Sequence, residues 1–190
     1  MKKIYVILLS LFVVTSLSLL FYYRAAILGY RNYTGVVDYN KSRDKAAILE
    51  IFNKNWYWLI SEYTKDFSPE FMLESLSHDK TSESYGQVTI KVMLDNGKPV
   101  GFVAYYMKTF YEGFLWFLAV NEEVRNKKYG KLLMKTAIDD LTKRGARYIR
   151  LITRTTNYPV QAVYKSLGFK ATHDNGKFVD FELMINHQTS

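Results

Sequence analysis

The densest group of cationic side chains in the chain lies in one short turn between a predicted strand and a predicted helix. Residues 124–131 read Val-Arg-Asn-Lys-Lys-Tyr-Gly-Lys, and the four cations are Arg125, Lys127, Lys128 and Lys131. A helix that begins here has unpaired backbone N–H groups and a partial positive charge at its start, which together attract anions. Gly130 has no Cβ and would let a phosphate approach the backbone. The turn therefore predicts a phosphate-binding site, with a solvated basic loop as the alternative.

Composition excludes several other kinds of chemistry. The chain has no cysteine, which excludes a disulfide framework, a thiol nucleophile and a thiolate metal site. His78, His173 and His187 are scattered without the spacing of metal ligands, so we expect no metal. Asp139 and Asp140 are adjacent on a predicted helix and do not face each other, which favours a solvated surface over a catalytic pair. The formal net charge of +8 suits an anionic partner without identifying it.

The start of the chain has the pattern of a membrane anchor. Residues 4–23 form an uncharged, mostly apolar run of twenty residues, preceded by two lysines and followed by Arg24. As a helix this run would extend over about 30 Å, enough to cross a bilayer core. A cleaved signal peptide is the alternative, but its apolar region is normally shorter. We therefore expect a transmembrane anchor over residues 1–24, followed by a connector over residues 25–34.

The rest of the chain predicts one mixed α/β domain over residues 35–187, in keeping with a length of 190 residues. Hydrophobic periodicity and turn residues predict strands over 36–39, 87–94, 99–110, 114–120, 148–153 and 178–185. Helices are predicted over 41–62, from Ser68 onward, over 130–144 and over 159–167. An Asp-Asn-Gly turn at residues 95–97 predicts a hairpin, and the strand over 114–120 would extend it into an antiparallel meander.

Short patterns in the second half of the chain resemble those of the Gcn5-related N-acetyltransferase (GNAT) family. Family members have a strand that ends in a Leu, Ala, Val type run, as residues 118–120 do here. An Arg or Gln, two residues, a Gly, one residue and a second Gly then open a helix, and Arg125 and Gly130 match this pattern. The chain departs from it at the first glycine, which is Lys128, and at a usual proline, which is Glu122.

A second pattern further along the chain also matches the family. An Asn is followed seven residues later by a Tyr and then by a Gly-Phe pair, here Asn157, Tyr164, Gly168 and Phe169. The resemblance covers residues 35–185, which is nearly all of the chain after the connector. It implies an α/β (α+β) fold with a mixed, mainly antiparallel central sheet flanked by helices. From the apolar run over residues 4–23, we expect one transmembrane helix before this domain.

The resemblance implies a site for acetyl-CoA, which serves as a cosubstrate. Backbone groups of Leu118 and Val120 would pair with its pantetheine arm, where the strand separates from its neighbour. The turn would hold the pyrophosphate, and its residues are Arg125, Asn126, Lys127, Lys128, Tyr129, Gly130 and Lys131. Asn157 would bond to the cosubstrate from the end of its strand. The alternative for Asn157 is a helix cap just before Pro159.

The implied reaction is direct attack of a primary amine on the thioester, with no protein nucleophile. Tyr164 is the expected catalytic acid, because a phenol with a pKa near 10 can donate a proton to the departing thiolate. The alternative is a packed aromatic ring in a chain with 16 tyrosines. Family members often have a glutamate base on the preceding strand, where this chain has Phe114. Glu112 is a weaker candidate for the base, because a solvated turn carboxylate is the favoured interpretation.

Three functions from different classes follow from these patterns. The favoured one is a membrane-anchored N-acetyltransferase whose domain faces the cytoplasm, because CoA thioesters are cytosolic metabolites. The second is a catalytically silent acyl-CoA-binding module, which Lys128 and the missing glutamate favour. The third is a binder of nucleic acid or of a lipid surface. No predicted helix or β-ribbon concentrates basic and aromatic residues as nucleic-acid readers do, so we expect no nucleic-acid partner.

Overall fold

The structure of the protein is a computed structural model that describes residues 32–60, 67–74 and 88–186. The expected membrane anchor over residues 1–24 lies outside the described residues, as does most of the connector. Within the described ranges, none of the helices has the length and apolar character that crossing a membrane requires.

The chain divides into two compact units. The larger one contains the described residues within 35–94 and 99–186 and includes every predicted site residue. Among the described residues, the smaller one contains 32–34 and the hairpin turn 95–98. Within the smaller unit, Thr34 Oγ1 accepts a hydrogen bond from the Asn96 N–H at 3.0 Å.

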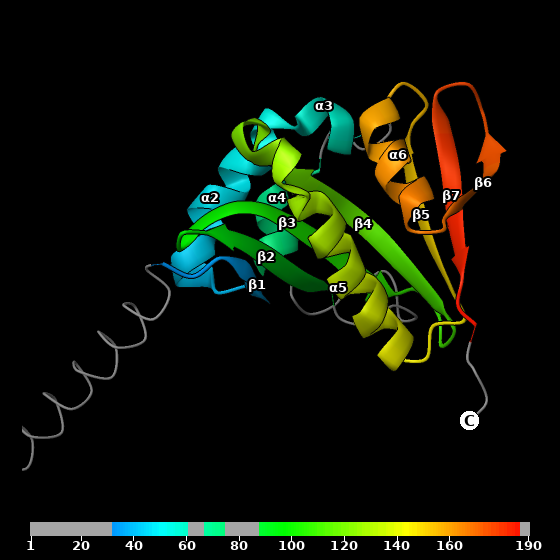
Figure 1. The fold of residues 1–190 in the computed structure, drawn as a ribbon, viewed down its shortest axis with the longest axis horizontal. Helices are drawn as coiled ribbons and strands as arrows, with labels where there is room; N and C mark the ends of the chain where they lie inside the picture. Colours follow the sequence, from blue (N-terminus) through cyan, green and yellow to red (C-terminus); the bar gives the residue numbers. More distant parts are fainter. Residues whose placement is uncertain (1–31, 61–66, 75–87, 187–190) are drawn as a thin grey trace, which may run out of the picture. The chain divides into compact units, whose positions relative to one another are not determined.

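One seven-stranded sheet forms the centre of the fold, with strands in the order β1-β2-β3-β4-β5-β7-β6 (Figure 1). The strands are β1 (Gly35–Asp38), β2 (Thr89–Asp95), β3 (Lys98–Met107), β4 (Glu112–Val120), β5 (Tyr148–Arg154), β6 (Lys170–Asp174) and β7 (Phe178–Met184). β4 and β5 run parallel, whereas the pairs β1–β2, β3–β4, β5–β7 and β6–β7 are antiparallel. The expected mixed, mainly antiparallel sheet is confirmed.

Helices pack on both faces of this sheet. They are α2 (Lys41–Lys54), α3 (Trp56–Leu59), α4 (Pro69–Glu74), α5 (Tyr129–Lys143) and α6 (Tyr158–Ser166), with a 3₁₀ turn η2 (Glu122–Lys127) before α5. On the face that we call the α2 side, Ile48 and Phe52 of α2 pack against Phe102 and Phe117 of the sheet. On the opposite face, the α5 side, one stripe of α5 packs with α6 against β3, β4, β5 and β7. The two faces have separate apolar cores, so α5 and α6 share a layer that α3 does not enter.

A bulge in β4 changes which side chains reach each core. The register pairs Tyr105 with Leu115 and Ala104 with Phe117, so Trp116 is an extra residue. Leu115 therefore lies in the core on the α5 side, and Phe117 lies in the core on the α2 side. Without the bulge, residues two apart on a strand would share one face.

Several predicted boundaries are wrong, each for a local reason. The helix predicted over 41–62 ends at Lys54, because Asn55 caps it and its buried Nδ2 donates to Ile51 O at 2.8 Å. A second short helix, α3, follows. β4 begins at Glu112 and not after a turn at that residue. β6 has no predicted counterpart, because all its side chains are exposed and it carries no buried stripe.

Candidate functional site

β4 and β5 pair at one end and separate at the other. Their parallel ladder joins Glu112 to Tyr148, Gly113 to Ile149 and Phe114 to Arg150, and it stops there. Beyond this point β4 pairs only with β3 among the described strands, while β5 continues its pairing with β7. Figure 1 shows the two strands close together near the start of β5 and apart near α3 and α6. Leu118 and Val120 lie on the separated part, so the strand separation that the resemblance implies is present.

The cationic turn leads directly from this part of β4 into α5. Its central residue, Lys128, has φ 61° and ψ 17°, which is the left-handed conformation. A non-glycine residue in this conformation costs about 1–2 kcal/mol, which accounts for a glycine at this position in the family pattern. The backbone here has the conformation that glycine favours, although the residue is lysine.

Gly130 follows in the first turn of α5, next to the end of β4. A Cβ added at Gly130 would meet only Val120 Cγ2, at an ordinary contact distance of 3.7 Å. Packing within the described residues therefore does not require glycine at this position. The space over the start of the helix is compatible with the close approach of a phosphate that the sequence predicts.

The structure separates the cations of the turn by what they contact. Arg125 Nη2 donates to Asn55 Oδ1 at 3.3 Å, and its Nη1 donates to Glu122 Oε1 at 3.1 Å. The Arg125 side chain is thus engaged with the end of α2. Lys127 Nζ lies 5.8 Å from the ring centre of Tyr129. Lys128 is exposed. Arg125 therefore links the turn to the end of α2.

Tyr164 lies on α6 and points into the core on the α5 side. The residue is 6% exposed, and its ring centre is 5.7 Å from that of Phe181 and 6.1 Å from that of Phe169. Burial raises the pKa of the Tyr164 phenol above its usual value. The phenol is therefore fully protonated at neutral pH, as a general acid must be. The ring also packs as the alternative interpretation expected, so the packing alone does not decide the role of the hydroxyl.

The Tyr, Gly, Phe spacing of the second pattern has a geometric cause. Gly168 has φ 90° and ends α6, and its N–H donates to Lys165 O at 3.0 Å. The Phe169 N–H reaches back to Tyr164 O at 3.1 Å. These two bonds form a Schellman motif, which requires a left-handed residue where the glycine stands. The motif fixes the end of α6 and brings Phe169 beside Tyr164.

Comparisons with known proteins agree with this geometry. The sequence profile of the acetyltransferase (GNAT) family matches residues 46–169. The chain belongs to the GNAT acetyltransferase family. The comparison with curated proteins gives no match.

Solved GNAT structures share the fold at low sequence identity. The ribosomal-protein-S18-alanine N-acetyltransferase of Escherichia coli has a TM-score of 0.60 at 19% identity, over 83% of this chain and 99% of that one. The PaiA N-acetyltransferase of Thermoplasma acidophilum, solved with coenzyme A, has a TM-score of 0.66 at 19% identity, over 80% and 99%. YncA of Salmonella typhimurium, solved with acetyl-CoA, has a TM-score of 0.65 at 17% identity, over 83% and 97%.

In this GNAT chain, Asn157 lies between the end of β5 and the start of α6, and it is half-buried. It occupies the N-cap position of α6, as the alternative expected, but its side chain makes no capping hydrogen bond. The side chain that joins the start of α6 to the end of β5 is Gln161, whose Nε2 donates to Arg154 O at 3.1 Å and to Thr155 O at 2.8 Å. The Asn157 amide remains a predicted ligand of the cosubstrate.

Glu112 differs from its sequence interpretation. It is only 6% exposed and is the first residue of β4, not a solvated turn residue. Its Oε2 accepts a hydrogen bond from Tyr148 Oη at 3.2 Å, and its Oε1 lies 3.7 Å from Lys108 Nζ. Six residues separate it from Leu118, which is about 20 Å along a strand. Glu112 therefore lies far from the separated strands and does not fit the role of base.

Two other features of the GNAT domain were missed at the sequence level. Asp140 is not merely solvated, because its Oδ2 accepts a hydrogen bond from the buried Tyr105 Oη at 2.8 Å. Burial, followed by this bond, raises the pKa of Tyr105. Arg154 at the end of β5 donates to backbone carbonyls of the α3 region. Neither contact had a local signal, since the partners are far apart in the sequence.

Proposed function

We propose that this GNAT chain is an acetyl-CoA-dependent N-acetyltransferase that moves an acetyl group to a primary amine by direct attack on the thioester. The observation that carries the proposal is the separation of β4 from β5 beside the start of α5. This separation leaves backbone N–H and C=O groups of β4 available on the side that faces β5. Structural neighbours with coenzyme A or acetyl-CoA, and one named for alanine N-acetylation, support the same reading.

The residues present fit acetyl-CoA. The backbone of Leu118 and Val120 would hold the pantetheine arm, and the turn residues 126–131 would hold the pyrophosphate. The left-handed Lys128 and the missing Cβ at Gly130 suit that task, because both allow successive N–H groups to face one anion. The Lys128 ammonium adds a point charge near the same anion. Asn157 would add a side-chain amide from the end of β5.

The chain's own groups divide the work of the reaction. Acetyl-CoA supplies an activated acyl group, so no enzyme nucleophile is needed. Tyr164 holds the proton that the departing thiolate takes, and burial keeps that proton in place at neutral pH. Because Glu112 is remote, we propose that the amine loses its proton to solvent water. The acceptor must then bind with its nitrogen neutral.

The sequence alone supports a further proposal about location. The apolar run over residues 4–23 favours a single-pass anchor that holds the domain at the cytoplasmic face of a membrane. Fusion of a reporter that is active only outside the cytoplasm to the C-terminus tests this. A silent reporter, with the protein in the membrane fraction, supports the proposal. An active reporter or a wholly soluble full-length chain contradicts it.

The proposed activity can be tested with the full-length protein in detergent. Isothermal titration with acetyl-CoA measures binding, and thiol release in the presence of pooled primary amines measures transfer. The matched control is the same pool with each amine fully methylated, because such amines cannot form a stable amide. Amine-dependent thiol release, with acetylated products by mass spectrometry, is the expected result. Binding without release would favour the silent acyl-CoA-binding module, and absence of binding would exclude both functions.

A further inference from the structure

The short helix α3 lies across the region where β4 and β5 separate. α2 ends at Asn55, and α3 covers only Trp56–Leu59. α3 contacts both β4 and β5. Figure 1 shows it near the far ends of these strands, beside the start of α6. One helical turn thus bridges two strands that no longer pair with each other.

Arg154, the last residue of β5, attaches this helical turn to the sheet. Its Nε donates to Tyr57 O at 2.6 Å, and its Nη2 donates to Ile60 O at 2.9 Å. A helix of one turn leaves its last carbonyl groups without N–H donors inside the helix. The planar guanidinium supplies two of these missing donors at once. It also lies 4.2 Å from the ring centre of Tyr57 and 5.2 Å from that of Phe178.

The other end of the same segment is attached to the phosphate turn. Asn55 is 9% exposed, and its Oδ1 accepts a hydrogen bond from Arg125 Nη2 at 3.3 Å. α3 is therefore held by two arginines, one from the turn after β4 and one from the end of β5. Arg125 belongs to the family pattern around the turn, whereas Arg154 belongs to no pattern that the sequence showed.

The aromatic side chains of α3 divide between the core and the surface. Trp56 packs against the core on the α2 side, as a buried helix face predicts. Tyr57 is 59% exposed and Trp58 is 40% exposed, and their ring centres lie 4.9 Å apart. Burial in the core therefore explains only the first residue of this aromatic run. Arg154 contacts the Tyr57 ring, and the Tyr57 ring in turn lies against Trp58.

We propose that Arg154 is a positioning residue for acetyl transfer: by fixing α3 across the separated strands, it shapes the side from which the acceptor amine approaches. The inference rests on the proposed function. The start of α5 and Tyr164 lie on the α5 side of the sheet, whereas α3 packs against the core of the α2 side. A cosubstrate held from the α5 side leaves the α2 side for the amine. α3 is the described element that spans the strands there.

Loosening α3 has two consequences. The amine is held less firmly in line with the thioester, so its KM rises and transfer slows. Water gains access to the same carbonyl carbon. Its oxygen attacks that carbon, the carbon–sulfur bond breaks, the thiol leaves with one of the water's protons, and acetate forms as the other proton passes to solvent. A positioning role therefore predicts more acetyl-CoA hydrolysis per acetyl group transferred, which a loss of overall stability would not produce.

The test compares Arg154→Ala and Arg154→Lys in the full-length protein, with Arg150→Ala as the matched control. Arg150 lies on the same face of β5, but it pairs with Glu182 at 2.8 Å and, within the described part of the chain, makes no hydrogen bond to α3. Steady-state kinetics with the best amine from the pool, and acetate release without amine, are the measurements. We expect Arg154→Ala to raise the amine KM by at least about tenfold and to raise the ratio of hydrolysis to transfer. Affinity for acetyl-CoA should change by less than about twofold.

The outcomes separate this inference from the proposed function. Arg154→Lys keeps the charge but offers no planar pair of donors, so its amine KM should fall between those of the wild type and Arg154→Ala. If Arg154→Ala fails to fold, by circular dichroism, Arg154→Lys alone carries the test. Wild-type transfer with unchanged amine KM and hydrolysis ratio in the folded variants would overturn the role of Arg154. Absence of transfer in the wild type would overturn the proposed function itself.

Discussion

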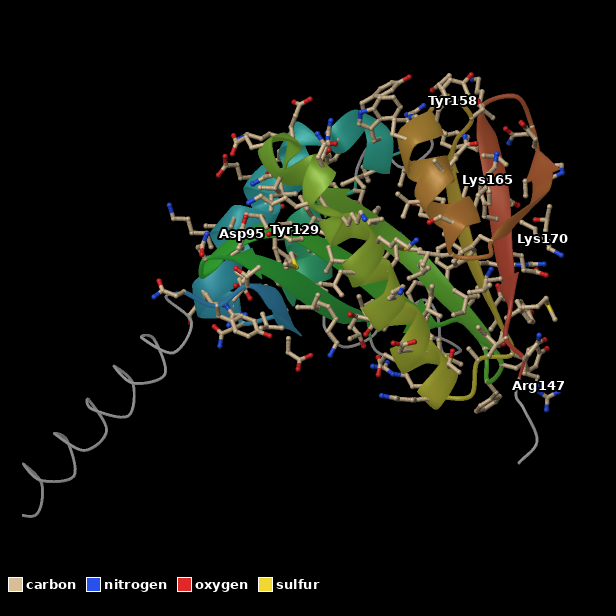
Figure 2. All side chains as sticks on the ribbon, viewed as in Figure 1. Asp95, Tyr129, Arg147, Tyr158, Lys165 and Lys170 are labelled. Atoms are coloured by element: carbon tan, nitrogen blue, oxygen red, sulfur yellow. The ribbon has the colours of Figure 1, made fainter. Side chains whose placement is uncertain are left out.

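The two ends of the β4–β5 pair are built in opposite ways. At the end near Glu112, three residue pairs join the strands, and the buried Glu112 carboxylate accepts a hydrogen bond from the half-buried Tyr148 phenol. At the end near Val120, no ladder joins the two strands, a left-handed turn follows β4, and Leu118 and Val120 pack against the same core that contains Tyr164. Figure 2 labels Arg147, just before β5, and Tyr158, the first residue of α6, which follows β5. The hydrogen-bonded ladder at the paired end keeps β4 and β5 in one sheet, although the strands separate beyond it.

The glycines at the two ends show the same contrast. At Gly113, an added Cβ would lie 2.9 Å from Leu141 Cδ1 and 3.2 Å from Ile149 Cγ1. At Gly130, the nearest atom would lie at 3.7 Å. A side chain at the first glycine would press on Leu141 of α5 and Ile149 of β5, whereas the second glycine has space beside it. Closely packed atoms serve stability, and the space at Gly130 is available for a ligand.

The largest effect is expected from Tyr164 near the separated end. Tyr164→Phe removes only the hydroxyl, so the buried ring keeps its packing. We expect kcat to fall by roughly 10² to 10⁴, the usual contribution of a general acid, while acetyl-CoA still binds. Thiol-release kinetics and isothermal titration measure the two quantities. Unchanged kcat in a folded variant would show that Tyr164 belongs to the core alone.

The pH dependence of kcat sharpens the same point. Burial raises the pKa of Tyr164 above the usual value near 10, so the acid form persists to higher pH than in a free tyrosine. Ionisation of Tyr164 should therefore cause no loss of kcat below about pH 10. A decline with an apparent pKa well below that value, absent from Tyr164→Phe, would contradict the burial argument.

Gly130 is expected to separate binding from folding. Gly130→Val should lower acetyl-CoA affinity by at least about tenfold, because the side chain would occupy the space proposed for the pyrophosphate. The free energy of unfolding should change by less than about 1 kcal/mol, since valine has no lower helix propensity than glycine. Titration and urea unfolding of the same preparation measure both. Undiminished affinity would remove the phosphate assignment of the turn.

Gly113 should show the reverse pattern. Gly113→Ala places a methyl group against Leu141 and Ile149 and should destabilise the protein by about 1–3 kcal/mol through overpacking. Acetyl-CoA affinity of the folded fraction should stay unchanged at a temperature well below the unfolding transition. Chemical unfolding measures the first quantity and titration the second. A stable variant with weakened binding would break the distinction between the two ends.

The smallest effect on catalysis is expected from Glu112. Glu112→Gln keeps an acceptor for Tyr148 and should leave kcat within about twofold of the wild type, because the residue is remote from the separated strands. Its stability change should be within about 1 kcal/mol, since the Lys108 pair is weak and partly exposed. A loss of kcat by about 10² would instead make Glu112 the general base.

Much of the fold could be predicted because its signals are local. The Gly168 and Phe169 bonds that end α6, the Pro69 start of α4 and the Gly145 end of α5 all act within a few residues. The sequence did not predict β6, because an exposed edge strand has no apolar periodicity. It did not predict the end of α2, because Trp56, Leu59 and Ile60 continue the helical spacing beyond the break at Asn55.

The sequence by itself determined the order of the strands and helices other than β6 and α3, the cationic turn and the position of Tyr164 in a family pattern, since each depends on neighbours along the chain. Only the tertiary structure decided that Glu112 is buried far from the turn, that Trp116 is a bulge and that Arg154 holds α3. Arg154 and Tyr57 are 97 residues apart, and Arg125 and Asn55 are 70 residues apart. Such contacts arise when packing of separate elements brings donors to carbonyl and amide groups that their own helices leave unpaired. Local propensity and periodicity carry no information about which distant donor will arrive.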